Sequence, residues 1–118
     1  MGNIASNKII NVPIVVNIKY SKLEKLIREL KKNSDNLNKS KIKTFEELEN
    51  NEYKNNFINY QEEINNEIIK IRKSISNNAN DINEYTKSTI KLKNYIFEIQ
   101  TIVKIFFEIV RDKSKFFI

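Results

Sequence analysis

"FINYQEEINNEIIKIRKSISNNANDINE", residues 57–84, is the stretch that decides the fold of this chain. Its apolar positions repeat every 11 residues, which is typical of a nearly straight α-helix. Beyond Ile82 the apolar spacing tightens to seven residues and continues to Val110. Without a break, this single stripe would need a helix of about 80 Å at 1.5 Å per residue. The first part of the stripe consists of Phe57, Tyr60, Ile64, Ile68, Ile71, Ile75, Ala79 and Ile82.

A break in this stripe is predicted at "SNNANDINE", residues 76–84. Asn and Asp are poor helix formers, and Asp81 with Glu84 can cap a new helix. Two architectures follow: a hairpin with a long overhanging second helix, and a three-helix bundle that folds back near Asn78. We favour the bundle, because an overhang would leave the apolar residues from Ile96 to Val110 without cover.

Two helix starts are predicted upstream of this stretch. Ser21 with Glu24, and Thr44 with Glu47, have the spacing of a capping box. We therefore expect helices over residues 22–38, 45–76 and 81–111. The predicted fold is all-α, an antiparallel helical hairpin extended to a three-helix bundle or by a long second helix. Residues 21–118 form its single helical domain, and residues 1–20 form an extended arm. The first helix has the apolar face Leu23, Leu26, Ile27, Leu30 and Leu37.

The composition argues against an enzyme. The chain has no Cys, no His and a single Gly. These counts exclude thiolate and imidazole catalysis, the commonest zinc sites and a glycine-rich phosphate loop. We expect no catalytic residue, no cofactor and no metal site.

Charge is distributed in blocks along the chain. Residues 1–43 carry ten basic and three acidic residues, whereas residues 44–67 carry one basic and seven acidic residues. An antiparallel hairpin would set the basic flank of the first helix beside the acidic residues of the second, so no ligand is needed to explain the blocks. The 19 Asn, 21 Ile and 18 Lys suggest an AT-rich genome. The glutamates expected to lie beside the basic flank of the first helix are Glu46, Glu47, Glu49, Glu52, Glu62 and Glu63.

The net charge of +6 and a small basic patch are the two features that suggest nucleic-acid binding. Lys87, Lys91 and Lys93 lie near Tyr85 and Tyr95 in the sequence. The chain has only three Arg, and no nucleic-acid-binding motif is recognised. We interpret the patch as a solvated helix face and expect no nucleic acid among the partners.

The C-terminal segment "IQTIVKIFFEIVRDKSKFFI", residues 99–118, is apolar around most of its circumference. Core packing explains the residues that continue the stripe, which are Ile99, Val103, Phe106 and Val110. Other apolar residues lie off that stripe, and a partner helix or a membrane surface would account for this excess. The residues predicted to bind a partner are Ile99, Ile102, Ile105, Phe106, Phe107 and Ile109.

The N-terminal residues carry two further signals. "MGNIAS" matches the N-myristoylation pattern, with Gly2 as the lipidation site, in a eukaryotic or viral setting. The run from Ile10 to Ile18 alternates β-branched residues with others, and Pro13 excludes a central strand. An extended arm along the bundle is the simplest interpretation. An edge strand added to a partner, or a ribbon across a dimer, is the alternative.

A family resemblance covers residues 16–88. The order "VNIKYSKLEKLIRELKKNSDNL", a short connection, then "NEYKNNFINYQEEINNEIIKIRKSISNNANDINEYTKS" resembles the WXG-like superfamily of small helical-hairpin proteins of type VII secretion, in particular its LXG-toxin-associated members. The connection "KSKIKTFEE" lacks a Trp-x-Gly turn, and no export motif follows the second helix. The resemblance implies binding to the helical N-terminal region of a toxin.

The sequence therefore predicts a non-enzymatic helical protein that binds a helical partner, in a heteromer or a homo-oligomer. The resemblance extends this to an adaptor or targeting factor for a type VII secreted toxin. Such a protein would reside in the bacterial cytoplasm before export and be secreted without a cleaved signal peptide. The alternative is an N-myristoylated peripheral membrane protein of an AT-rich eukaryote or virus, whose membrane contact depends on modification of Gly2.

Overall fold

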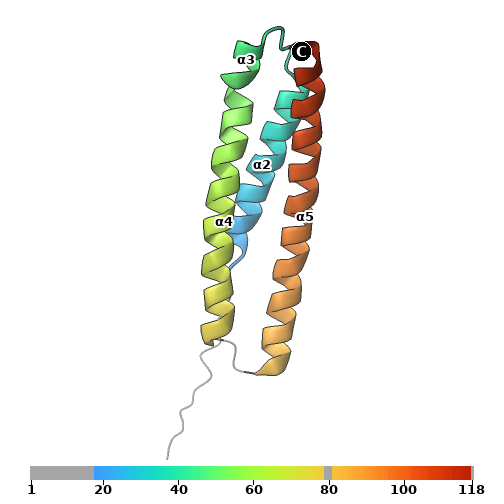
Figure 1. Ribbon diagram of the computed structural model, residues 1–118. Coiled ribbons are helices and arrows are strands. Elements are labelled where there is room, and N and C mark those ends of the chain that lie inside the picture. Colours follow the sequence, from blue (N-terminus) through green and yellow to red (C-terminus); the bar gives the residue numbers. More distant parts are fainter. Residues whose placement is uncertain (1–17, 79–80, 118) are drawn as a thin grey trace, which may run out of the picture.

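A computed structural model describes residues 18–78 and 81–117 of the chain (Figure 1). Gly2 and most of the alternating run that ends at Ile18 lie outside these residues. The described part is helical apart from its connections and contains no strand, which confirms the all-α prediction. Its elements are α2 (Ser21–Lys39), α3 (Phe45–Glu49), α4 (Glu52–Asn78), α5 (Ile82–Ser114) and the 3₁₀ turn η1 (Lys115–Phe117).

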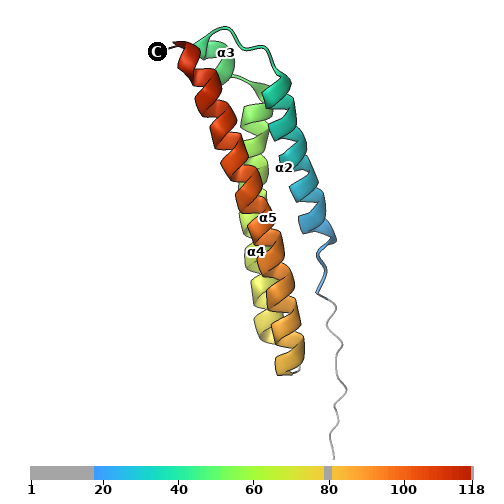
Figure 2. The same cartoon turned by 90° about the vertical axis from the view of Figure 1, so that its right-hand side faces the viewer.

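The three long helices pack side by side with alternating direction (Figure 1). The chain reverses between Asn78 and Ile82, so the predicted fold-back is confirmed. However, α2 has 19 residues and α5 has 33, and Figure 2 shows α4 and α5 continuing well beyond the N-terminal end of α2. The three-helix bundle is therefore the architecture found, and a single long second helix is not. Because α2 is short, the ends of α4 and α5 near the α4–α5 turn form a two-helix overhang (Figure 2).

Two of the three predicted caps are present. The Thr44 hydroxyl accepts from the Glu47 backbone N–H at 3.1 Å, and the Glu47 carboxylate accepts from the Thr44 N–H at 3.0 Å. Asp81 caps α5 by accepting from the Glu84 N–H at 2.7 Å. The box predicted at Ser21 and Glu24 is wrong. Ser21 already lies inside α2, and the Glu24 side chain instead accepts a hydrogen bond from Tyr95.

The predicted helix over residues 45–76 is interrupted after its first turn. It begins at Phe45 as expected, but α3 ends at Glu49 and α4 begins at Glu52. The side chain of Asn51 accepts from the Lys54 backbone N–H at 3.0 Å, which caps a new helix. A short polar side chain of this kind competes with continuous helix for the backbone donors.

The core runs along the line where the three long helices meet. Toward the α3 end of this core, the rings of Phe57 and Phe106 stack with centroids 3.6 Å apart. Ile82, expected to continue the apolar stripe, is instead 78% exposed at the tip of the overhang, because α2 does not reach that far. The buried apolar residues are Tyr20, Leu23, Leu26, Ile27, Leu30, Leu37, Leu48, Phe57, Ile64, Ile68, Ile71, Ile75, Leu92, Ile99, Ile102 and Phe106.

The expected charge pairing between the first two helices is largely wrong. Among the described residues, the ion pair that joins α2 to α4 is Lys22 with Glu67, at 3.9 Å, and none of the predicted glutamates takes part. The reason is geometric. Because α2 packs against both α4 and α5, basic residues such as Lys25, Arg28 and Lys32 point to solvent.

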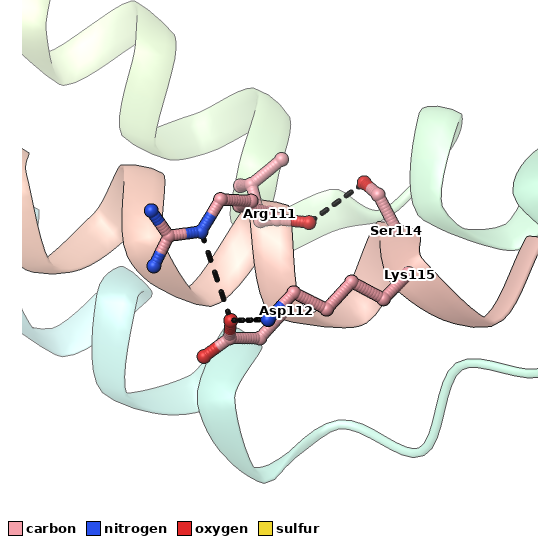
Figure 3. Close-up of polar contacts among 5 residues, drawn as sticks. Arg111, Asp112, Ser114 and Lys115 are labelled. Atoms are coloured by element: carbon pink, nitrogen blue, oxygen red, sulfur yellow. Dashed lines mark hydrogen bonds and ion pairs between the residues drawn. The ribbon is translucent and has the colours of Figure 1, made fainter. Parts of the chain in front are cut away.

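The C-terminal end of α5 is hydrogen-bonded to the C-terminal end of α2. The Lys113 ammonium donates to the carbonyl oxygens of Asn38 at 3.2 Å and Ser40 at 2.8 Å. Local contacts shape the same turn: Asp112 lies 3.4 Å from the Lys115 ammonium, and the Ser114 hydroxyl donates to a backbone carbonyl one turn earlier (Figure 3). The exposed ion pairs contribute little to stability, whereas Lys113 satisfies carbonyls at the C-terminal end of a helix.

Candidate functional site

A groove runs between α4 and α5 and is the candidate functional site. It consists of two adjoining pockets that share Ile96, so we treat them as one surface and name it the α4/α5 groove. The pocket nearer α3 has a volume of about 350 Å³, and the pocket nearer the α4–α5 turn about 220 Å³. The first is lined by Gln61, Asn65, Ile68, Ile96, Ile99, Gln100, Val103 and Lys104. The second is lined by Arg72, Ile75, Ser76, Tyr85, Thr89, Leu92, Lys93 and Ile96.

Helical spacing explains why these residues share a surface. The lining positions recur three or four residues apart along each helix, so they form one face of α4 and one face of α5. The floor consists of residues that also belong to the core, namely Ile68, Ile75, Leu92 and Ile99. The walls are mostly polar or partly buried side chains. The groove is therefore an edge of the core that no helix of the described chain covers.

The groove lies on the side of α4 and α5 that faces away from α2. No α2 residue lines either pocket. In Figure 1 α2 lies behind α4 and α5, and Figure 2 shows the same arrangement from the side. The α5 residues that bond to the start of α2 are different ones: Ser88 accepts from the Tyr20 hydroxyl, and Tyr95 donates to Glu24. One face of α5 therefore contacts α2, and a different face of α5 lines the groove.

The charges around the groove have one sign. Arg72 lines it from α4, and Lys93 and Lys104 line it from α5, while no acidic residue lines either pocket. Among the residues that the structure describes, no ion pair involves any of these three cations. The groove therefore has an apolar floor and basic side chains along both walls.

The face of α5 toward α2 holds a cluster of aromatic and charged residues. The rings of Tyr20 and Tyr95 stack with centroids 5.5 Å apart, and the Lys91 ammonium lies 4.5 Å from the Tyr20 ring centroid. The Tyr95 hydroxyl donates to Glu24 at 2.6 Å. Burial and this bond to Glu24 raise the pKa of Tyr95 to about 12. Burial also raises the pKa of Tyr20, partly offset by its bond to Ser88.

The basic patch seen in the sequence is divided by the fold. Lys91 and Tyr95 turn toward α2, where they contact Tyr20. Lys93 and Tyr85 instead line the α4/α5 groove. These residues therefore do not form one continuous surface.

Three of the predicted partner-binding residues belong to the core. Ile99, Ile102 and Phe106 are at most 8% exposed, so their side chains are not available to a partner in this arrangement. Ile99 and Phe106 lie on the apolar stripe, for which core packing was the expected alternative. Ile102 lies off the stripe and is buried because α5 packs against both α2 and α4. Ile109 is partly buried against the same core, whereas Ile105 and Phe107 are exposed.

Several surface residues were not singled out from the sequence as partner-binding residues. Phe97 is 72% exposed, and Ile58, Ile69 and Ile90 are each about half exposed. The groove residues Gln61, Asn65, Ile96, Gln100 and Val103 were also missed as a surface. A helical projection of α4 and α5 that marks both edges of the apolar stripe would have found them, because the groove follows one edge on each helix.

No cluster of three or more acidic residues that could hold a metal ion occurs in residues 18–78 and 81–117. Within the same residues, no helix combines the length and apolar character needed to cross a bilayer.

Comparison of the chain with protein families, with curated proteins and with solved structures found no match. Function is therefore inferred from the groove, the exposed apolar side chains and the charges.

Proposed function

We propose that this chain is a non-enzymatic helical protein that binds a helix of another protein in the α4/α5 groove. The observation that carries this proposal is the uncovered edge of the core between α4 and α5. α2 packs against both α4 and α5 and so covers one side of this pair. A docked helix on the other side would contact the same two helices and cover the exposed edge of their core.

The groove has the dimensions of a helix site. Its α4 wall extends from Gln61 to Ser76, which is about 22 Å at 1.5 Å per residue. A partner helix of about four turns would cover it, with apolar residues at the i, i+3, i+4 and i+7 positions that helix-in-groove recognition uses. Docking would bury Ile96 and Val103 more completely. Phe107 lies one turn beyond Val103 on the same face of α5 and would extend the contact.

We further propose that the partner is a toxin of type VII secretion, for which this chain acts as an adaptor or targeting factor. Support comes from the resemblance of residues 16–88 to the WXG-like helical hairpins and from the antiparallel packing of α2 and α4. The partner segment would then be the helical N-terminal region of the toxin. The complex would form in the bacterial cytoplasm before export.

Site-specific cross-linking tests the docking surface. The chain has no Cys, so Gln100→Cys introduces a unique attachment point for a benzophenone in the groove. Asn94→Cys provides the control, because Asn94 is also exposed on α5 but does not line the groove. In source cells we expect position 100, and not position 94, to cross-link to a helical segment of a second protein. Cross-links from position 94 alone, or none from position 100, would contradict the proposal.

A further inference from the structure

We infer that the helix that binds the α4/α5 groove carries acidic residues along both flanks of its apolar stripe. This inference rests on the proposed function and adds the chemistry of the partner. It starts from the three cations that line the groove, Arg72, Lys93 and Lys104, and from the absence of any acidic side chain among the lining residues described above.

The three cations are placed to contact both flanks of a docked helix. Arg72 and Lys93 line the same pocket from opposite walls. Lys104 follows Lys93 by 11 residues, which is three helical turns or about 16 Å along α5. All three side chains are exposed, so they border the apolar floor rather than forming part of it. In coiled coils, residues at the corresponding flanking positions pair with opposite charges and decide which helix binds.

The charge of the groove argues against other occupants. A two-fold dimer brings identical surfaces together, so a second copy placed groove to groove would set these cations against each other. Residues 1–17 of the chain contain Lys8 and no acidic residue, so their sequence offers no complementary charge. An acidic amphipathic helix from another protein satisfies both the apolar floor and the basic walls.

The expected contribution of these charges is to selectivity. Exposed ion pairs at the edge of an interface add little affinity each, but they exclude partners of the wrong charge and raise the association rate. We therefore expect that, of two helices with the same apolar stripe, the acidic one binds more tightly than the basic one. This difference in affinity should decrease as the salt concentration rises, because the cations are exposed to solvent.

Two synthetic amphipathic peptides test the inference against the full chain. Both have Leu along one face over about five turns; one has Glu at the flanking positions and the other has Lys. Fluorescence anisotropy should show at least tenfold tighter binding of the Glu peptide at low salt, with a smaller difference at high salt. The triple variant Arg72→Glu, Lys93→Glu, Lys104→Glu should prefer the Lys peptide.

A matched triple variant controls for net charge. Lys70→Glu, Lys73→Glu and Lys87→Glu make the same change in charge at exposed positions outside the groove. This variant should keep the preference for the Glu peptide. If the control variant reverses the preference as fully as the groove variant does, the effect belongs to net charge and the inference is wrong.

The remaining outcomes separate the inference from the proposed function. If both peptides bind equally and cross-link to a benzophenone at position 100, helix docking stands and the acidic partner is wrong. If neither peptide binds, the inference is wrong, and the cross-link from position 100 in source cells decides the proposed function separately. A cross-link from position 100 to a second copy of the chain would identify a homodimer and overturn the inference.

Discussion

The rings of Phe57 and Phe106 lie almost parallel, with 2° between their planes and 3.6 Å between their centroids. The two residues come from α4 and α5, are 49 positions apart in the sequence and are at most 2% exposed. This stack joins the two helices that form the groove. It also shows why Phe106, an obvious candidate for partner binding in the sequence, is instead a structural residue.

Phe106→Ala should therefore cost about 3–5 kcal/mol in the free energy of unfolding, the range for a buried Phe replaced by Ala. Phe107→Ala is the matched control, because the neighbouring ring is 58% exposed, and it should cost less than 1 kcal/mol, as partly exposed contacts do. Urea denaturation followed by circular dichroism measures both values. Equal losses in the two variants would contradict the placement of Phe106 in the core.

Ser34→Ala should raise stability by about 1 kcal/mol. The Ser34 side chain is 2% exposed, and its hydroxyl has no hydrogen-bond partner in the structure. Removing an unsatisfied buried hydroxyl recovers its desolvation cost, and Ala is the better helix former. Ser76→Ala, at an exposed position of α4, isolates the propensity effect and should give about half as much. A lower melting temperature for Ser34→Ala would show that the hydroxyl is satisfied.

Stability should fall as the pH rises from about 10 toward 12. The pKa of Tyr95 is raised to about 12 in the folded chain, so the unfolded chain loses the Tyr95 proton first and unfolding becomes more favourable in this interval. Urea denaturation at each pH measures the loss, and absorbance at 295 nm reports tyrosinate. Tyr95→Phe should remove this part of the pH dependence.

A second variant tests the cause of that pKa shift. Glu24→Gln removes the carboxylate that accepts the Tyr95 hydrogen bond and repels a tyrosinate charge. The pKa of Tyr95 should fall toward its ordinary value, although burial would still keep it raised. If the absorbance titration is the same with and without Glu24, the hydrogen bond does not form in solution.

Lys113→Met should cost about 1 kcal/mol of stability, because its ammonium donates to two carbonyls at the end of α2. Lys115→Met provides the comparison. Its ammonium pairs with the exposed Asp112 carboxylate, an interaction that contributes about 0–1 kcal/mol. Thermal denaturation of both variants is sufficient, and a larger loss for Lys115→Met would contradict the structure.

Local sequence signals predicted those features of the fold that depend on neighbouring residues. The caps at Thr44 and Asp81 and the reversal after Asn78 all follow from side chains within a few positions of the backbone that they affect. The cap at Ser21 failed because Glu24 bonds to Tyr95, a residue 71 positions away. The interruption between α3 and α4 was not predicted. Asn51 lies among several other Asn residues, and the sequence does not show which of them caps a helix.

The site was harder to predict because burial depends on how many helices surround each position. In the sequence, Phe106 lies on the apolar stripe and Phe107 lies off it. Because α5 is apolar around most of its circumference, both residues were nevertheless predicted to bind a partner. Packing against both α2 and α4 buries the first and leaves the second exposed. The groove lies on the side of α4 and α5 that no described helix covers. Which side is left uncovered depends on how the three helices pack together, so the sequence of one helix does not reveal it.

The short length of α2 gives the molecule two regions of unequal resistance to local opening. Where α2 lies alongside α4 and α5, each helix has two neighbours, whereas near the α4–α5 turn the ends of α4 and α5 have only each other (Figure 2). Amide protons near the α4–α5 turn should exchange with solvent faster than those beside α2, because fewer buried contacts hold their hydrogen bonds closed. A helix seated along the whole groove would contact both regions. Binding should then slow exchange at the tip and make the hairpin open as a single cooperative unit.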